Sequence, residues 1–301
     1  MSLLLPVPEG LPLGPNGPKI GPIAWGMWRL AGTVANAAIL ARTALDAGLN
    51  LFDTADIYGF DGSDGFGDAE SLLGQVIASE PSLKERAVIA TKGGIRPPVP
   101  YDQSEVYLKS AIEASLRRLR IERINLYQIH RPDILTHPHE LARALEDAVA
   151  QGKIGALGVS NFTITQIETL QHFLALPLVS TQPEISPLRI DCLENGEMDQ
   201  AIRLGLRPLA WSPLGGGRLF HPASDCDRAV VAALDAVAND QGVSRSVAAY
   251  SWLMAHPAGI VPIIGSQRRE RISEAADAVR VRWTRQQWYA VLVAARGKIM
   301  P

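Results

Sequence analysis

Short apolar runs alternate with longer amphipathic stretches along most of the chain. The runs are too short for helices and predict buried strands. The longer stretches repeat apolar residues every three or four positions, as one face of a helix does. The predicted strands cover 20–25, 49–52, 87–91, 124–129, 154–159, 178–181, 207–210 and 259–263. The predicted helices cover 34–47, 69–78, 104–119, 140–151, 164–174, 197–204, 227–239, 246–255 and 285–295.

Strands that alternate with helices predict βαβ units and a parallel sheet. Eight such units in 301 residues indicate a single α/β domain over residues 1–301, a closed (β/α)8 TIM barrel. A doubly wound open sheet is the alternative architecture. It is disfavoured because no G-x-G-x-x-G opens a helix after the first predicted strand. A turn around Gly14–Gly17 predicts a hairpin ahead of that strand.

Composition narrows the class of protein. The chain is 47% hydrophobic and 20% charged with a formal net charge of −2, and no block of Lys or Arg indicates nucleic-acid binding. Two cysteines, Cys192 and Cys226, offer neither a disulfide framework nor the spacing of a metal site. The N-terminal segment lacks the features of a signal peptide, and no apolar run has the length of a membrane span. We therefore expect a cytoplasmic protein without a metal, a membrane or a nucleic acid as partner, either a monomer or a weak homo-oligomer.

Titratable side chains follow three successive predicted strands. Asp53, Lys92 and His130 each stand at a strand end, and Tyr58 lies five residues after Asp53 in a glycine-rich loop. Each has an ordinary structural explanation alone: a capping carboxylate, a surface lysine, a core histidine, a packed tyrosine. In a barrel, however, the carboxyl ends of all strands meet on one rim, where active sites lie. The joint arrangement therefore predicts a catalytic site.

The chain resembles the aldo-keto reductases over nearly its whole length. The resemblance rests on the order and spacing of several motifs. These are Asp46-Ala47-Gly48, Asp53-Thr54-Ala55-Asp56-Ile57-Tyr58-Gly59, Ala90-Thr91-Lys92, Gln128-Ile129-His130, Gly158-Val159-Ser160-Asn161-Phe162, the segment 210–217, and the segment 262–272. A Gly-Met-Trp-Arg-Leu segment at 26–30 is similar to one subgroup of bacterial oxidoreductases in the family.

The resemblance implies a catalytic tetrad of Asp53, Tyr58, Lys92 and His130. Reduction of a carbonyl needs a hydride at carbon and a proton at oxygen. A free tyrosine, with a pKa of about 10, donates poorly near neutral pH, and a neighbouring lysine cation lowers that pKa. We expect Tyr58 to be the general acid, Lys92 to lower its pKa, Asp53 to orient Lys92, and His130 to position the substrate oxygen.

The resemblance also implies a nicotinamide cofactor. Ser160, Asn161 and Gln182 are expected to bind the carboxamide, Trp211 to stack on the ring, and the glycine loop to approach the pyrophosphate. Arg271 suits a 2′-phosphate, which favours NADPH over NADH. Relatives often carry a lysine at the position of Gly265. The expected cofactor-binding residues are Ser160, Asn161, Gln182, Trp211, Ser212, Leu214, Gly215, Gly217, Gly265, Ser266, Gln267, Arg271 and Glu274.

The expected activity is NADPH-dependent reduction of aldehydes and ketones to alcohols. Met27 and Trp28, with Tyr58 and His130, are expected to line the substrate pocket, and no rim arginine indicates a charged substrate. Two alternatives remain open. One is a nucleotide-binding regulatory subunit with the same fold, and the other is a barrel lyase that uses Lys92 as a Schiff-base nucleophile.

Overall fold

Eight parallel strands close into a barrel in the computed structural model, which describes residues 4–5, 10–14 and 17–298. The order around the barrel is β10-β11-β4-β5-β6-β7-β8-β9. Neighbouring strands are therefore consecutive in sequence except where the last barrel strand, β11, pairs with the first, β4, and closes the barrel. The predicted (β/α)8 fold is confirmed. The barrel strands are β4 (Ala24–Gly26), β5 (Leu51–Asp53), β6 (Val88–Gly93), β7 (Ile124–Ile129), β8 (Ile154–Ser160), β9 (Leu178–Gln182), β10 (Arg207–Ala210) and β11 (Val261–Ile264).

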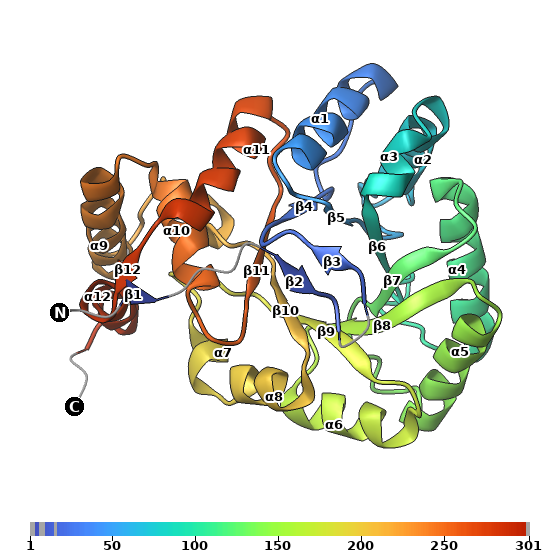
Figure 1. Cartoon of the computed structure of the whole chain (residues 1–301). Helices are drawn as coiled ribbons and strands as arrows, with labels where there is room; N and C mark the ends of the chain where they lie inside the picture. The colour runs from blue at the N-terminus through green and yellow to red at the C-terminus, as the bar shows by residue number, and fades with distance from the viewer. Residues whose placement is uncertain (1–3, 6–9, 15–16, 299–301) are drawn as a thin grey trace.

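Helices surround the strands in a ring (Figure 1). Thr33, Ser104 and Thr163 cap three of these helices, because their side chains accept hydrogen bonds from backbone N–H groups in the first turn. The helices are α1 (Val34–Asp46), α2 (Asp68–Ser79), α3 (Ser82–Arg86), α4 (Glu105–Leu119), α5 (Pro138–Ala150), α6 (Ile164–Phe173), α7 (Asp191–Glu194), α8 (Glu197–Leu204), α9 (Asp225–Gln241), α10 (Arg245–Met254), α11 (Arg269–Ala275) and α12 (Arg285–Arg296), with 3-10 turns η1 (Gly215–Gly217) and η2 (Ala276–Arg280).

The predicted strand 20–25 is wrong as one element. The structure has β3 (Lys19–Ile20), which pairs with β2 (Leu11–Pro12), and a separate barrel strand, β4. The break follows from Gly21-Pro22: Pro22 has no N–H for a ladder, and a Cβ on Gly21 would lie 1.9 Å from the Gly48 carbonyl oxygen. An apolar run alone does not reveal this turn.

The hairpin β2–β3 closes the N-terminal end of the barrel, and its strands lie across the ring of strands in Figure 1. Leu13 and Ile20 are fully buried and pack in one cluster with inward side chains of the barrel, such as Leu51, Val88 and Leu126. The predicted hairpin is confirmed, although Pro15 and Asn16 of its turn lie outside the described residues. The barrel interior is therefore packed at this end.

A second addition lies beside the barrel. β1 (Leu4–Leu5) pairs with β12 (Trp283–Thr284), and α9 and α12 stand next to them at one side of the molecule (Figure 1). Trp252 of α10 stacks on Trp288 of α12 with ring centroids 4.9 Å apart, and each indole N–H donates to the other residue's carbonyl. Among the described residues no helix is both long and apolar enough to cross a membrane.

Candidate active site

The titratable residues predicted at the strand ends do meet at the C-terminal rim. Asp53 is the last residue of β5, Lys92 is the fifth of six residues in β6, and His130 directly follows β7. Tyr58 lies in the turns after β5, where its N–H donates to the Ala55 carbonyl at 3.1 Å. Neighbouring parallel strands bring these side chains together because their carboxyl ends share one edge.

Lys92 is the centre of this group. Its Nζ donates to the Asp53 carboxylate at 2.7 Å, to the Thr54 carbonyl at 2.8 Å and to the Tyr58 hydroxyl at 3.2 Å. These three bonds use every donor of an ammonium group. Lys92 is 0% exposed, so the charge is stabilised by these partners and not by water.

The electrostatics differ from the sequence-based expectation in one respect. Burial opposes the charge of Lys92, but contact with Asp53 and Tyr58 outweighs it and raises the pKa of the lysine. Burial also raises the pKa of Tyr58, and Asp53 adds to this, so that the lowering by Lys92 is overcome. The expected lowering by Lys92 is therefore present, but burial of the phenol makes the net direction a raised pKa. The lysine limits the rise.

His130 stands beside the phenol. The two rings meet edge to face with centroids 5.7 Å apart, and the His130 backbone N–H donates to the Gly93 carbonyl. Burial, together with the charges of Lys92 and Arg131, holds the pKa of His130 well below its usual value. The imidazole is thus neutral near pH 7, and its buried Nδ1 has no hydrogen-bond partner among the described residues.

Asp53 is held by two glutamines on its other oxygen. Gln182 Nε2 donates to Asp53 Oδ1 at 3.0 Å, and Gln128 Nε2 donates to the same oxygen at 3.3 Å. Gln182, predicted to bind a carboxamide, is therefore directed at the carboxylate in this structure. Gln128 was not predicted as a site residue. Its place two positions before His130, on the inward face of β7, is the signal that identifies it.

Ser160, Asn161 and Trp211 form a hydrogen-bonded group on the same rim. Asn161 Nδ2 donates to Ser160 Oγ at 2.8 Å, and Trp211 Nε1 donates to Asn161 Oδ1 at 3.0 Å. Ser160 Oγ in turn donates to the Gln182 carbonyl at 2.9 Å. Asn161 has φ = 59°, a left-handed conformation that asparagine tolerates better than most residues. The predicted residues are thus brought together and held in fixed orientations.

The glycine loop after β10 begins at Ser212, which also has a positive φ of 52°. Gly215, Gly216 and Gly217 all have positive φ, so substitution by most residues would strain the loop. Leu214, the residue before them, is partly buried against the core. The loop is held at its far end by Arg218, whose guanidinium binds the buried carboxylate of Asp227 through Nε at 3.1 Å and Nη2 at 2.5 Å. Sequence reasoning missed this ion pair because no helix or strand periodicity pairs residues nine positions apart.

The loop after β11 carries the remaining predicted cofactor residues. Ser266 accepts a hydrogen bond from Trp25 Nε1 on its carbonyl at 3.1 Å, and both amide atoms of Gln267 are buried without a partner among the described residues. Arg271 and Glu274 follow in α11, and Arg271 forms no ion pair with any described residue. Gly265, at the start of this loop, leaves a space that Arg29 approaches.

Arg29 lies beside this loop, and sequence reasoning did not single it out. Its Nη1 lies 3.4 Å from the position that a Cβ on Gly265 would take, and its guanidinium lies over the Trp28 ring, 4.8 Å from the centroid. Across the part of the chain that the structure describes, it has no acidic partner. The strand pairing of β4 with β11 is the only signal that connects these positions.

Two of the residues predicted to line the substrate pocket lie in different environments. Trp28 is 62% exposed at the rim, whereas Met27 is 0% exposed and packs in the core between barrel and helices. Met27 is buried because its N–H pairs with the Asp53 carbonyl, which continues the barrel ladder by one residue. Its assignment to the pocket lining is therefore wrong.

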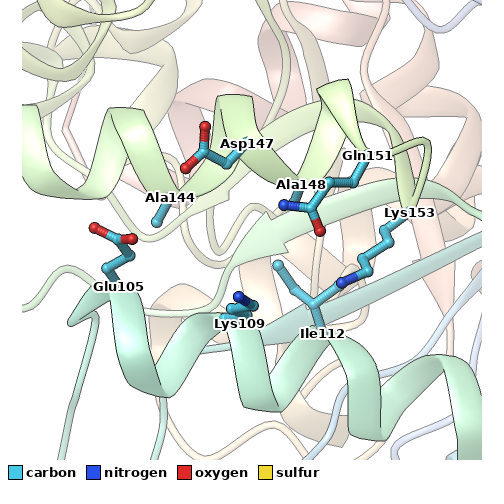
Figure 2. Close-up of a pocket in the computed structure, with 8 residues that line it drawn as sticks. All are labelled: Glu105, Lys109, Ile112, Ala144, Asp147, Ala148, Gln151 and Lys153. Atoms are coloured by element: carbon cyan, nitrogen blue, oxygen red, sulfur yellow. The ribbon is translucent and has the colours of Figure 1, made fainter.

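The structure has one hollow near this rim and another away from it. One, of about 540 Å³, is formed between the loops after β5 and β6 by Phe60, Phe66, Arg96 and Tyr107 among others. Figure 2 shows the other, a crevice of about 40 Å³ between α4 and α5, lined by charged residues such as Glu105, Lys109 and Lys153. None of the predicted site residues lines this crevice, which lies on the outer layer of helices.

The fold and the rim together define a class: a (β/α)8 enzyme with a buried Asp–Lys–Tyr group at the carboxyl ends of its strands. A family model described as the aldo/keto reductase family matches residues 22–292. The chain belongs to the aldo/keto reductase family.

Curated relatives and a solved structure agree with this assignment. The chain is 67% identical over 301 residues to a 6-dehydroglucose reductase of Novosphingobium aromaticivorans, with 99% of each chain covered. It is 36% identical to a 6-dehydroglucose reductase of Agrobacterium fabrum, over 93% of this chain and 96% of the relative. A thermostable aldo-keto reductase crystallised with the inhibitor epalrestat superposes with a TM-score of 0.81 at 24% identity, over 95% of this chain and 99% of that one.

Proposed function

We propose that this protein reduces an aldehyde to a primary alcohol with NADPH, and that Tyr58 supplies the proton. The observation that carries the proposal is the Tyr58 hydroxyl held at 3.2 Å from the Lys92 ammonium, beside a neutral His130. A phenol in this position can give up its proton because the ammonium stabilises the phenolate that remains.

Each member of the group has a separate part in the proposed reaction. Bound NADPH supplies the hydride. Tyr58 donates its proton to the carbonyl oxygen as the C–O bond becomes single, so that the product is the neutral alcohol. Lys92 stabilises the phenolate, and Asp53 holds Lys92 charged and in place through the 2.7 Å contact. His130, whose neutral imidazole carries one N–H donor, is suited to donate a hydrogen bond to the substrate oxygen.

The donors and acceptors along the rim fit a nicotinamide dinucleotide. The Asn161 side chain and the Trp211 indole lie next to each other, where a carboxamide and a ring face need them. Among the described residues, the Gln267 amide has no hydrogen-bond partner and Arg29 and Arg271 have no ion-pair partner, so all three offer donors for phosphate oxygens. We assign Arg271 to the 2′-phosphate of NADPH and Arg29 to a phosphate near Gly265.

We further propose that the substrate is 6-dehydroglucose, the compound named for the relative at 67% identity. Removal of two hydrogens at position 6 of a hexose gives an aldehyde, which is the group that this chemistry reduces. The product of the reaction is then the hexose itself. An uncharged sugar agrees with the expectation of a neutral carbonyl substrate.

The two alternatives carry less support. A Schiff-base lyase needs a neutral amine with a free lone pair, whereas Lys92 is held by three acceptors and its pKa is raised. A nucleotide-binding subunit without activity would not need the Asp53–Lys92–Tyr58 group. That group is intact in this chain.

Turnover with a reactive aldehyde tests the proposal. We expect oxidation of NADPH with 4-nitrobenzaldehyde and with 6-dehydroglucose, and a higher kcat/KM for the sugar aldehyde. Tyr58→Phe removes the hydroxyl group and with it the proton to be donated, so kcat should fall by about 10²- to 10⁴-fold while the NADPH dissociation constant stays within about twofold. Retained turnover in Tyr58→Phe would exclude Tyr58 as the proton donor, and turnover of 4-nitrobenzaldehyde alone would exclude the sugar.

A further inference from the structure

Gln128 is a buried amide inside the barrel to which the proposed reaction gives no part. It is 0% exposed and lies on β7, where the strand register places it opposite Lys92 of β6. Ala90 and Leu126, two positions earlier on the same strands, belong to the apolar cluster that fills the barrel interior. Since side chains alternate across a strand, Gln128 and Lys92 point into the barrel as well. An amide buried there is costly unless both of its ends are hydrogen-bonded.

Both ends of the Gln128 amide have partners. Its Nε2 donates to Asp53 Oδ1 at 3.3 Å, and its Oε1 accepts from Ser180 Oγ at 3.3 Å. The same Oε1 accepts a longer bond from Gln182 Nε2, at 3.5 Å. The opposite orientation of the amide would set its oxygen against the Asp53 carboxylate, so these contacts together fix which end faces the acid.

Ser180 reaches Gln128 across an intervening strand. Gln128 pairs in register with Gly158 of β8, and Gly158 pairs in register with Ser180 of β9. A Cβ at position 158 would lie 2.1 Å from Ser180 Oγ and 3.0 Å from Gln128 Cγ. The first distance is far inside van der Waals contact, so the absence of a side chain on Gly158 is what lets the two polar residues meet.

These contacts end on the group that holds the reacting phenol. Asp53 Oδ1 accepts from Gln182 at 3.0 Å as well as from Gln128, while Oδ2 accepts from Lys92 at 2.7 Å. Lys92 in turn donates to the Tyr58 hydroxyl. The last torsion of an aspartate side chain is soft, so the donors on Oδ1 restrict where Oδ2 lies, and with it the ammonium.

The two glutamines on Asp53 differ in what else can bind them. Gln182 is the last residue of β9, and sequence reasoning assigns it to the carboxamide of the cofactor, so a ligand can compete for its amide. Gln128 lies deeper, and each of its hydrogen bonds is to the protein. It therefore holds Asp53 whether or not Gln182 turns towards a ligand.

We propose that Gln128 is a positioning residue for the Asp53 carboxylate. Its hydrogen bond fixes the carboxylate, which keeps the Lys92 ammonium against the Tyr58 hydroxyl. Ser180 fixes Gln128 in turn, across the glycine of β8. Gln128 touches neither substrate nor cofactor in this role. Its effect on turnover rests on the proposed function of Tyr58, whereas the bond to Asp53 does not.

A double-mutant cycle between Gln128 and Asp53 tests this role. Gln128→Met keeps the length of the side chain but removes a donor to a charged acceptor, so kcat with 4-nitrobenzaldehyde should fall by about 10- to 100-fold. The KM for the aldehyde and the NADPH dissociation constant should stay within about threefold, because only the reacting group is displaced. In the Asp53→Leu background no carboxylate is left to position, so the same substitution should change kcat by less than about threefold. An equal loss of kcat in both backgrounds overturns the proposal.

Gln171→Met is the matched control for the loss of a glutamine. Gln171 of α6 is half-buried, donates to the Leu174 and Leu176 carbonyls, and accepts from the Leu178 N–H at the start of β9. Its substitution also removes three hydrogen bonds, but at the opposite end of that strand. It should lower the melting temperature and leave kcat unchanged. A comparable loss of kcat in Gln171→Met would make the effect of Gln128→Met one of general destabilisation and overturn the positioning role.

Ser180 and Gly158 test how Gln128 is held. Ser180→Ala removes one hydrogen bond to the amide, so kcat should fall by about 3- to 10-fold. Gly158→Ala places a Cβ against Ser180 Oγ and Gln128 Cγ, and should lower kcat at least as far as Gln128→Met. Gly10→Ala, whose Cβ would meet only the Ile20 carbonyl oxygen at 3.6 Å, is the control and should keep the wild-type kcat. If Gly158→Ala does not fold, Ser180→Ala decides, and wild-type kcat in Ser180→Ala overturns the part of Ser180.

Failure of the proposed function gives a different result from failure of this inference. If wild type reduces no aldehyde, the proposed function fails, but the free energy of unfolding still decides whether Gln128 and Asp53 are bonded. Denaturant titration of the four proteins of the cycle should show a smaller loss for Gln128→Met in the Asp53→Leu background than in the wild-type background. Equal losses would mean that the two side chains do not interact, which overturns the inference.

Discussion

Residues on the rim differ in whether their donors and acceptors already have partners within the protein. Lys92 has used all three donors, and Asp53 accepts from Lys92, Gln128 and Gln182. Arg29 and Arg271, by contrast, carry full charges with no ion-pair partner in the described structure. The first group is held in place by contacts within the protein, and the two arginines can contact a ligand.

The assignment of Arg271 predicts a selective effect on the two cofactors. Arg271→Ala should raise the NADPH dissociation constant by about 10- to 100-fold, because a charge-assisted bond to the 2′-phosphate is lost. NADH, which lacks that phosphate, should change by less than about threefold, within the range of a neutral surface substitution. Titration of protein fluorescence with both cofactors measures this.

Arg117→Ala removes the same charge from the last turn of α4 and should leave both constants unchanged. Equal losses for NADPH and NADH in Arg271→Ala would contradict the 2′-phosphate assignment. A loss for both cofactors in Arg29→Ala would agree with a contact to a phosphate that they share.

The elements of the fold divide into those that carry the site and those that support it. Strands β5 to β9 each supply a polar side chain at the C-terminal rim, whereas Leu13 and Ile20 of the β2–β3 hairpin pack among apolar side chains at the opposite end. Residues at one end of the barrel can therefore be substituted without changing the residues at the other end.

The hairpin is expected to matter for stability and not for binding. Leu13→Ala removes a side chain that is 0% exposed at the closed end of the barrel and should cost about 2–5 kcal/mol of unfolding free energy. Leu135→Ala, at a position 91% exposed, should stay within about 0.5 kcal/mol. Denaturant titration measures both, and NADPH affinity should be the same in each variant at 25 °C. Weakened cofactor binding in folded Leu13→Ala would mean that the two ends are coupled.

At the scale of the whole molecule, barrel closure brings β11 next to β4 and so joins the last motif of the chain to the first. Trp25 Nε1 reaches the Ser266 carbonyl across 241 positions of sequence. A ligand that contacts several strand ends of a closed barrel stabilises the whole ring.

This predicts a global thermal effect of the cofactor. NADPH at about 100 times its dissociation constant adds about 2.7 kcal/mol to the stability of the folded state. In a protein of 301 residues that corresponds to a rise in melting temperature of about 4 °C. NADH at the same concentration should give a smaller rise. Calorimetry on wild-type protein tests this without any turnover, and an unchanged melting temperature with NADPH would argue against a preformed cofactor site.

Much of this architecture could be predicted because periodicity and strand ends are local signals. The strands at 124–129 and 207–210 and the helix at 197–204 have the predicted bounds, and Lys92 meets Asp53 as the strand order requires. The Gly21-Pro22 break was missed because an apolar run hides a turn. Gln128 and Arg29 were missed for a different reason, since their importance depends on which strands are neighbours.

The protonation of buried groups was the least predictable property. The sequence places Tyr58 near a lysine, which suggests a lowered pKa, but not how deeply the phenol is buried. Burial decided the direction for Tyr58, and it also raises the pKa of Asp56. Desolvation depends on every element packed around a group, and no motif contains that information.

The closed end formed by Leu13 and Ile20 has a kinetic consequence. Apolar side chains of the described residues fill that end, so in the proposed reaction we expect the dinucleotide and the aldehyde to enter from the C-terminal face and both products to leave by it. The molecule that lies deeper is then expected to bind first and to dissociate last. Product release, as well as proton transfer from Tyr58, is therefore expected to affect the rate of successive turnovers.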